Sequence, residues 1–314
     1  MRDPSFGRSA ALFRAFLREQ DDPDAAYELL ARDAADQIER LVPLEGRVVV
    51  DVGGGRGYFT REFRRRGAHG YLFEPDPAEL GPAASAGPTG PGGTAACPGE
   101  TAGPRETAGF GRTTAGSSGT VASSDRTAAG SSGTVTNSDR TTAGSGGTLA
   151  DSDRTAAGSG GAVVVADGYL LPLADGAADV CFSSNVLEHV RDPGTFLSEL
   201  VRVTRPGGLI YVSFTNWLSP WGGHEWAPWH YLGAERARAR YERRTGRAAK
   251  HRLGENLFAI GVGPTLRHVR GRDDVEILSA RSRYWPVLPG VVTRIPVVRE
   301  FATWNLLLLL RRCS

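Results

Sequence analysis

Four glycines in five positions follow a short apolar run in "VVVDVGGGRGYFT", residues 48–60. A glycine-rich turn after a strand lets a ligand approach bare backbone. The spacing of Gly53, Gly55 and Gly57 is G-x-G-x-G, whereas dinucleotide sites use G-x-G-x-x-G, and no Gly-Lys-Ser/Thr of a triphosphate loop is present. Both phosphate interpretations are therefore weakened. The alternative without a ligand is a tight turn between a strand and a helix.

Two carboxylates follow the next two expected strands. Glu74 comes 17 residues after Gly57 and ends the strand Tyr71–Phe73, where it is able to accept both hydroxyls of a ribose. Asp167 follows the strand Ala162–Val165 and is suited to accept from an exocyclic amine such as that of adenine. Because open α/β sheets bind ligands at the carboxyl ends of their strands, these positions favour a nucleoside site. A solvated strand end is the alternative for Glu74.

Four segments resemble the successive motifs of class I S-adenosylmethionine-dependent methyltransferases, close to the type-11 subgroup. They are "VVVDVGGGRGYFT", "LFEPDP", "ADGYLLPLADGAADVCFSSNVLEHVRDP" and "LVRVTRPGGLIYVSF", within roughly 45–80 and 162–215. The resemblance implies a contact for each part of the cofactor. Asp51 and Gly53–Gly57 would approach its methionine part, and Glu74 would bind its ribose. Asp167 and Gly168 would bind the adenine edge, and Asn185 and Leu187 would line the methionine side. S-adenosylmethionine contains no phosphate, so it also suits a glycine loop without a phosphate clamp.

The segment "SFTNWLSPWGGHEWAPWHYLG", residues 213–233, predicts a substrate wall. It holds four of the six tryptophans and several titratable side chains, and it follows a strand at the cofactor edge. His224 and Glu225 are candidates for a catalytic base, as is His189 in "NVLEHV". The alternatives are a packed lid and a structural His189. A metal at His224, Glu225 and His230 lacks a clear third ligand, so no metal is expected.

The alternation of strands and helices predicts an α/β fold. Amphipathic helices are expected at 9–18 and 25–42, with Asp24 as a cap, and the apolar strands indicate a parallel sheet covered on both faces. Val275–Ala280 and Thr303–Leu310 read as strands without a useful helix between them, so one is expected to run antiparallel. The family resemblance implies a doubly wound, mostly parallel seven-stranded sheet, with the seventh strand antiparallel.

Residues 81–162 differ in composition from the rest of the chain. "TAAGSSGTVTNSDR" recurs with a period of 14 residues, and large apolar side chains are almost absent. Such a segment buries too little surface to offset chain entropy, so a long disordered insertion is predicted, with a solenoid as the alternative. The insertion would divide a single methyltransferase domain into the halves 1–80 and 163–314.

Composition and charge argue against several classes of protein. A net charge of +2, from 37 basic and 35 acidic residues, gives no argument for nucleic acid. Cys97, Cys181 and Cys313 are widely spaced, which fits a reducing cytoplasm better than a disulfide framework. The longest aliphatic run, 306–310, is too short for a membrane span and suits a buried strand. The basic stretch 235–252 indicates a solvated helix face or peripheral contact with anionic substrate or lipid headgroups.

These features together predict S-adenosylmethionine-dependent methyl transfer. The expected acceptor is a small-molecule, glycan or lipid-linked compound, with oxygen favoured slightly over nitrogen or carbon. One alternative is an NAD-linked oxidoreductase on a similar sheet, which the glycine spacing disfavours. The other is a non-catalytic protein that binds S-adenosylmethionine or recruits partners through its repeats.

Overall fold

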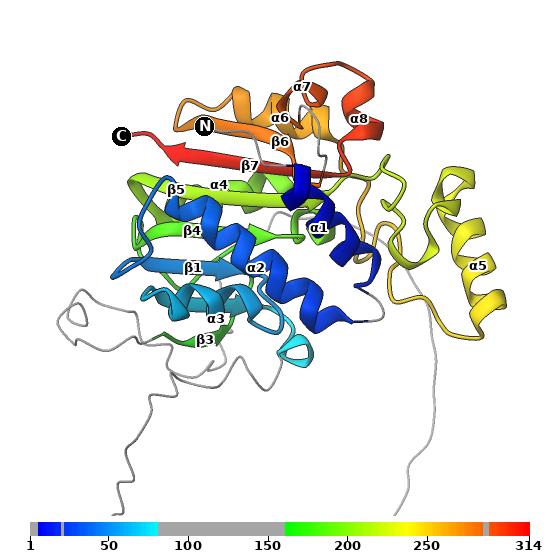
Figure 1. Cartoon of the computed structure of the whole chain (residues 1–314), viewed down its shortest axis with the longest axis horizontal. Coiled ribbons are helices and arrows are strands. Elements are labelled where there is room, and N and C mark those ends of the chain that lie inside the picture. The colour runs from blue at the N-terminus through cyan, green and yellow to red at the C-terminus, as the bar shows by residue number, and fades with distance from the viewer. Residues whose placement is uncertain (1–5, 20–21, 81–160, 285–288) are drawn as a thin grey trace, which may run out of the picture. The chain divides into compact units, whose positions relative to one another are not determined.

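The computed structural model describes residues 6–19, 22–80, 161–284 and 289–314 of the chain. These residues contain a seven-stranded sheet in the order β3-β2-β1-β4-β5-β7-β6 (Figure 1). The strands are β1 Val48–Val52, β2 His69–Glu74, β3 Val163–Val165, β4 Ala178–Ser184, β5 Thr204–Thr215, β6 Val275–Ser282 and β7 Asn305–Arg312.

Strand directions confirm the expected arrangement. The pairs β1–β2, β1–β4, β2–β3 and β4–β5 are parallel. β7 lies between β5 and β6 and runs antiparallel to both. The carboxyl ends of β1, β2, β3 and β4 therefore lie at one edge of the sheet, where ligands of open α/β sheets bind.

Helices cover both faces of the sheet (Figure 1). The larger ones are α1 Phe6–Leu17, α2 Pro23–Glu39, α3 Tyr58–Arg65, α4 Pro193–Val203, α5 Ala234–Thr245 and α6 Val262–Arg270. Shorter ones are η1 Pro77–Glu79, η3 Leu187–His189, η4 His224–Trp226, η5 Trp229–Leu232, α7 Pro289–Val292 and α8 Val298–Ala302.

Alternation along β7 divides the hydrophobic core between the two faces. Leu307 and Leu309 pack in the cluster that contains α1, α2 and α3. Leu306, Leu308 and Leu310 belong to the cluster that contains α4 and α6. Because successive side chains of a strand point to opposite faces, a run of five leucines serves both halves of the core. The run is buried, as its sequence predicts.

Two local features differ from the sequence prediction. Asp22, rather than Asp24, caps α2, because its side chain accepts from the Ala25 backbone N–H at 3.1 Å and Pro23 occupies the first turn. β5 begins at Thr204, so "RPGG" is part of the strand instead of preceding it. The pairing with β4 shifts in register between Ala178 and Val180, and this irregularity accommodates the additional residues.

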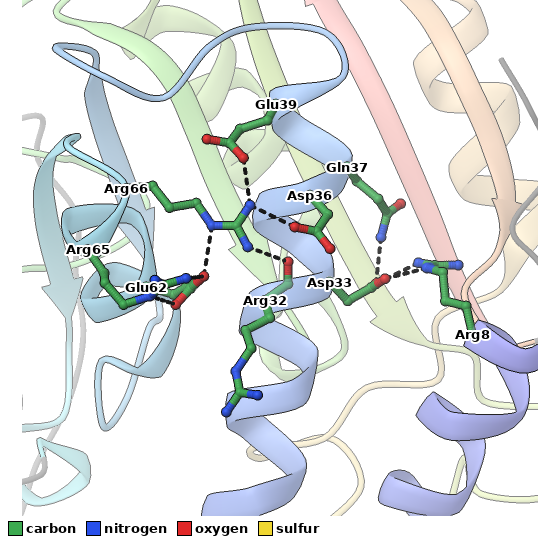
Figure 2. A network of polar contacts seen from close by, with 9 residues as sticks. All are labelled: Arg8, Arg32, Asp33, Asp36, Gln37, Glu39, Glu62, Arg65 and Arg66. Atoms are coloured by element: carbon green, nitrogen blue, oxygen red, sulfur yellow. Dashed lines mark hydrogen bonds and ion pairs between the residues drawn. The ribbon is translucent and has the colours of Figure 1, made fainter.

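A network of ion pairs joins the helices of one face (Figure 2). Arg66, just after α3, contacts Glu62 at 2.8 Å, and Asp36 and Glu39 of α2 at 2.7 and 2.6 Å. Its guanidinium also donates to the Arg32 carbonyl at 3.2 Å. Arg8 of α1 forms an ion pair with Asp33 of α2, so an ion pair also joins α1 to α2.

The predicted insertion of 81–162 lies almost entirely outside the described residues. The described chain runs through η1 to Leu80 and returns at Gly161. The Leu72 N–H donates to the Ala162 carbonyl at 2.9 Å, so the returning chain joins β2 directly as β3. Among the helices of the described residues, none is both long and apolar enough to cross a membrane.

Candidate active site

Asp51 is a buried carboxylate near the end of β1. Its side chain is 1% exposed, and one oxygen, Oδ2, accepts from the Thr60 hydroxyl at 2.7 Å. The other oxygen, Oδ1, is buried and has no hydrogen-bond partner among the described residues. Burial raises the pKa of Asp51 to about 7, and the charge of Glu74 adds to this, although the Thr60 hydrogen bonds oppose it. An unpaired buried carboxylate oxygen is suited to a ligand that donates hydrogen bonds.

The glycine loop takes a backbone conformation that side chains disfavour. Gly53 and Gly55 have φ values of 73° and 50°. A Cβ on Gly53 would lie 2.6 Å from Val186 Cγ2, so the loop packs closely against the turn that follows β4. A Cβ on Gly55 would meet nothing within 4 Å, which leaves its backbone accessible.

Glu74 connects this loop to the end of β2. The side chain is 6% exposed, and Oε2 accepts from the Gly55 N–H at 2.9 Å. Oε1 accepts from the Asp76 N–H at 3.2 Å. Each carboxylate oxygen has two lone-pair directions, so both retain capacity for a ligand hydroxyl. Glu74, predicted at a strand end, is thus a direct neighbour of Gly55 in the glycine loop.

Asp167 and Gly168 lie at the end of β3. The Asp167 carboxylate is exposed and accepts from the Tyr169 N–H at 2.9 Å. A Cβ on Gly168 would be 2.8 Å from the Phe196 ring and 3.4 Å from Val52 Cγ1. Gly168 therefore packs beside the end of β1, which puts the predicted adenine-edge residues close to the glycine loop.

Asn185 and Leu187 lie in the turn after β4 and differ in exposure. Asn185 has a φ of 58°, and its Oδ1 accepts from Asn305 Nδ2 at 2.8 Å. Leu187 is 0% exposed and belongs to the hydrophobic core. Its side chain therefore anchors the turn in the hydrophobic core.

Three histidines converge beside this turn. His189 ends η3, His224 begins η4, and His251 follows α5. One ring nitrogen of each lies within 4.8 Å of the other two. The ring centroids of His224 and His251 are 4.4 Å apart, and that of His189 lies 5.1 and 5.3 Å from them. We call these three residues the histidine cluster.

Glu225 completes the surroundings of the histidine cluster. Its carboxylate bonds to His251 Nδ1 and accepts from the His251 backbone N–H at 2.9 Å. Burial acts to raise the pKa of Glu225, but the hydrogen bonds from His251 outweigh burial and hold it at about 2. Burial lowers the pKa of His224 to about 3, with the neighbouring His251 and His189 adding to the shift. Glu225 is thus ionised and His224 neutral at physiological pH.

His230, the other titratable residue of the predicted substrate segment, lies elsewhere. It is buried, and its Nε2 bonds to the Trp217 carbonyl at 3.0 Å. Three tryptophans of this segment pack against protein: Trp226 is buried beside Trp217, and Trp221 contacts Phe13 and Phe16 of α1. The fourth, Trp229, is exposed. This packing fits the lid alternative for most of the segment.

A loop after α5 crosses the carboxyl edge of the sheet. Lys250 pairs with Glu79 of η1 at 2.8 Å, beyond the end of β2. His251 joins the histidine cluster, and the Phe258 N–H donates to the Glu188 carbonyl at 2.8 Å, beyond the end of β4. Residues 250–258 thus connect the ends of two strands that carry predicted cofactor residues.

Two residues of this site are not predicted from the sequence. His251 lies in the basic stretch 235–252, whose composition suggests a solvated helix face. Asn305, which positions Asn185, lies at the start of β7, beside an aliphatic run that indicates only a buried strand. No local signal marks either residue, because each acts through a partner far away in the sequence. His251 lies 62 positions after His189, and Asn305 lies 120 positions after Asn185.

Several known proteins resemble this chain. A family model described as a methyltransferase domain matches residues 26–254. A methyltransferase of Mycolicibacterium gilvum is 35% identical over 313 residues, covering 98% of this chain and 95% of the relative. One of Mycobacteroides abscessus is 35% identical over 310 residues, covering 97% and 93%. The crystal structure of an S-adenosylmethionine-dependent methyltransferase from Mesorhizobium loti is 17% identical, with a TM-score of 0.45 and coverage of 92% and 99%.

The family match covers most of the chain, and the relatives match over nearly their whole length. The seven-stranded sheet with an antiparallel β7 is the fold that the motifs predict. The chain therefore belongs to the class I S-adenosylmethionine-dependent methyltransferases, enzymes whose cofactor is S-adenosyl-L-methionine.

Proposed function

We propose that this enzyme methylates an oxygen of a small-molecule, glycan or lipid-linked acceptor, and that the histidine cluster activates that oxygen. One observation supports this proposal above all. His189, His224 and Glu225, which the sequence singles out as candidate catalytic residues, gather around His251 beside the turn that carries Asn185. A group of titratable side chains next to a cofactor site is typical of acid–base chemistry.

The residues at the carboxyl edge fit the cofactor. Asp51 Oδ1, buried without a partner, suits the amino group of the methionine part. Glu74 suits the ribose hydroxyls, and Asp167 the adenine amine, while the backbone at Gly55 is open to close approach. When bound, S-adenosylmethionine supplies an electrophilic methyl group on a sulfonium. The protein's contribution is to hold and orient the reactants.

Transfer to a hydroxyl requires that the hydroxyl lose its proton. The new bond forms between the acceptor oxygen and the methyl carbon, and the methyl–sulfur bond breaks with its electrons on sulfur. Within the histidine cluster, Glu225 is engaged with His251, and the low pKa of His224 makes it a weak base. His189 bonds the Asn256 carbonyl through Nδ1 at 2.7 Å, so that this hydrogen bond does not occupy Nε2.

The loop 250–258 and the tryptophan-rich segment would form the remaining walls of the acceptor site. Their contacts with η1, η3 and α1 hold them near the cofactor edge. Peripheral contact of 235–252 with anionic headgroups stays a prediction: Arg238 is paired with Glu235 and Glu242 within α5. We place the enzyme in the cytoplasm, in keeping with the unpaired Cys181 and Cys313.

Transfer of a labelled methyl group into extracts of metabolites, glycans and lipids tests the proposed function. We expect a labelled product with the wild-type chain. The variants His189→Asn and Glu225→Gln should lower its rate by roughly a hundredfold or more, since proton removal contributes on that order. Their affinity for S-adenosylmethionine should stay within about twofold of the wild type.

The matched control is His268→Asn, because His268 is an exposed histidine of α6 outside the cluster. It should transfer methyl at the wild-type rate. Wild-type rates in the two cluster variants would overturn the role given to the cluster. Absence of labelled product from every acceptor class, with intact cofactor binding, would overturn the proposed reaction.

A further inference from the structure

We propose that His189, His224 and His251 bind one zinc ion, that Glu225 orients His251 as a ligand, and that the fourth coordination position takes the acceptor oxygen. Only the identity of the fourth ligand rests on the proposed function. The sequence predicts no metal, because His224, Glu225 and His230 lack a clear third ligand; the structure brings His251 to His224 instead.

The positions of the ring nitrogens support a shared metal. One nitrogen from each histidine lies within 4.8 Å of the other two. Zinc–nitrogen distances of about 2.0–2.1 Å in a tetrahedral site place two ligand nitrogens roughly 3.4 Å apart. Small side-chain rotations would therefore bring the cluster to coordination distance. Three histidines with one open position form the ligand set of a catalytic rather than a structural zinc site.

The outer hydrogen bonds of the cluster are those that metal-binding histidines make. His251 Nδ1 bonds the Glu225 carboxylate, and His189 Nδ1 bonds the Asn256 carbonyl at 2.7 Å. A carboxylate or carbonyl partner at one ring nitrogen fixes the tautomer and leaves the other nitrogen free to bind metal. Two of the three histidines thus have the outer partners that a zinc site requires.

His224 contributes two further observations. Its Nε2 is buried and has no hydrogen-bond partner among the residues that the structure describes. Its backbone has a φ of 49°, in the left-handed region that non-glycine residues rarely adopt. Such conformations are held at functional sites by the surrounding structure. A metal ligand at Nε2 would account for both the unpaired nitrogen and the conformation that presents it.

Ligand chemistry selects the metal. Imidazole nitrogens suit zinc and neighbouring transition metals, whereas magnesium and calcium prefer oxygen ligands. Methyl transfer changes no oxidation state, so a redox-inert ion is sufficient. A zinc-bound hydroxyl has a lowered pKa, and its proton leaves to solvent near neutral pH. This gives the histidine cluster a way to activate an acceptor.

Direct binding measurements test the site without reference to activity. The full chain, free of any histidine tag and stripped of metal, is titrated with Zn²⁺ by calorimetry and with Co²⁺ by visible absorption. We expect one ion per chain and an absorption spectrum typical of tetrahedral cobalt. His189→Asn, His224→Asn and His251→Asn should each weaken Zn²⁺ binding by more than about a hundredfold, and Glu225→Gln by about ten- to a hundredfold.

Two further comparisons keep the outcome decisive. His268→Asn should bind Zn²⁺ like the wild type, and circular dichroism should show that every variant is folded. Substoichiometric binding, or equal affinity in the cluster variants and His268→Asn, would overturn the site. Full methyl transfer by the metal-free chain would overturn the zinc-bound acceptor while leaving the proposed reaction intact. One-to-one binding without methyl transfer would support the site and contradict the reaction.

Discussion

At the scale of single residues, Asp51 links cofactor binding to pH. Its carboxyl is buried with one unpaired oxygen, and burial raises its pKa from 3.8 to about 7. Between these values the folded chain holds a proton that the unfolded chain has released. The free energy of unfolding therefore falls as pH rises from about 4 to about 7, since ionised Asp51 is disfavoured in the folded state.

A cationic ligand group at Asp51 would favour the ionised carboxylate. We therefore predict that S-adenosylmethionine binding releases a proton below pH 7, and that affinity rises by up to about tenfold per pH unit from pH 5 to 7. Calorimetry in two buffers with different ionisation enthalpies measures this proton. Asp51→Asn should bind more weakly and lose the pH dependence. An affinity of the wild type that stays constant between pH 5 and 7 would contradict the assignment of Asp51.

The residues of the site differ in how well the sequence predicts them. Gly53, Gly55, Glu74 and Asp167 are predictable because each follows a strand, and parallel strands bring their carboxyl ends together. His251 is not predictable, because a loop that crosses the sheet brings it to His189 and His224.

At the scale of elements, charged side chains join α2 and α3. Glu62 is 8% exposed and receives hydrogen bonds from Arg65 and Arg66, while Arg66 continues to Asp36 and Glu39 (Figure 2). Burial acts to raise the pKa of Glu62, but these arginines lower it below its ordinary value. The stabilisation is therefore present above about pH 4.5 and is lost as pH falls through the lowered pKa.

We predict that Glu62→Gln lowers the free energy of unfolding at pH 7 by about 1–3 kcal/mol, because it weakens charge-assisted hydrogen bonds in a partly buried site. Urea unfolding measures the change, and the difference from the wild type should shrink toward pH 3. Glu28→Gln is the control, since the Glu28–Arg32 pair is exposed and should contribute less than about 1 kcal/mol. Equal effects of the two substitutions would contradict the structural role of Glu62.

Strand positions are more predictable than element boundaries. The continuous apolar run of β1 predicts that strand to the residue, whereas β7 begins and ends two residues later than the predicted Thr303–Leu310. The cap of α2 and the start of β5 differ from the prediction. Asp22 and Asp24 are equivalent candidates in sequence, and "RPGG" carries turn signals although it lies within the bounds of β5. Tertiary contacts decide such cases, and they are absent from local patterns.

At the scale of the whole molecule, one sheet is built from two separated parts of the chain. β1 and β2 come from the first part, and β3 to β7 from the second. We propose that 81–162 is an insertion in the connection between β2 and β3. The entropic cost of closing a loop grows only slowly with its length, so a long segment in this connection adds little cost.

Binding measurements on the full chain test most directly whether the cofactor lies at the carboxyl edge of the sheet. S-adenosylmethionine binding is measured by calorimetry for the wild type, Glu74→Gln and the control Glu79→Gln. Glu74 is buried against the glycine loop, whereas Glu79 is exposed and pairs with Lys250. We predict one binding site per chain, unchanged affinity in Glu79→Gln, and at least about a tenfold loss in Glu74→Gln, where an ionised acceptor for the ribose is removed. Wild-type affinity in Glu74→Gln would contradict the placement of the cofactor at this edge of the sheet.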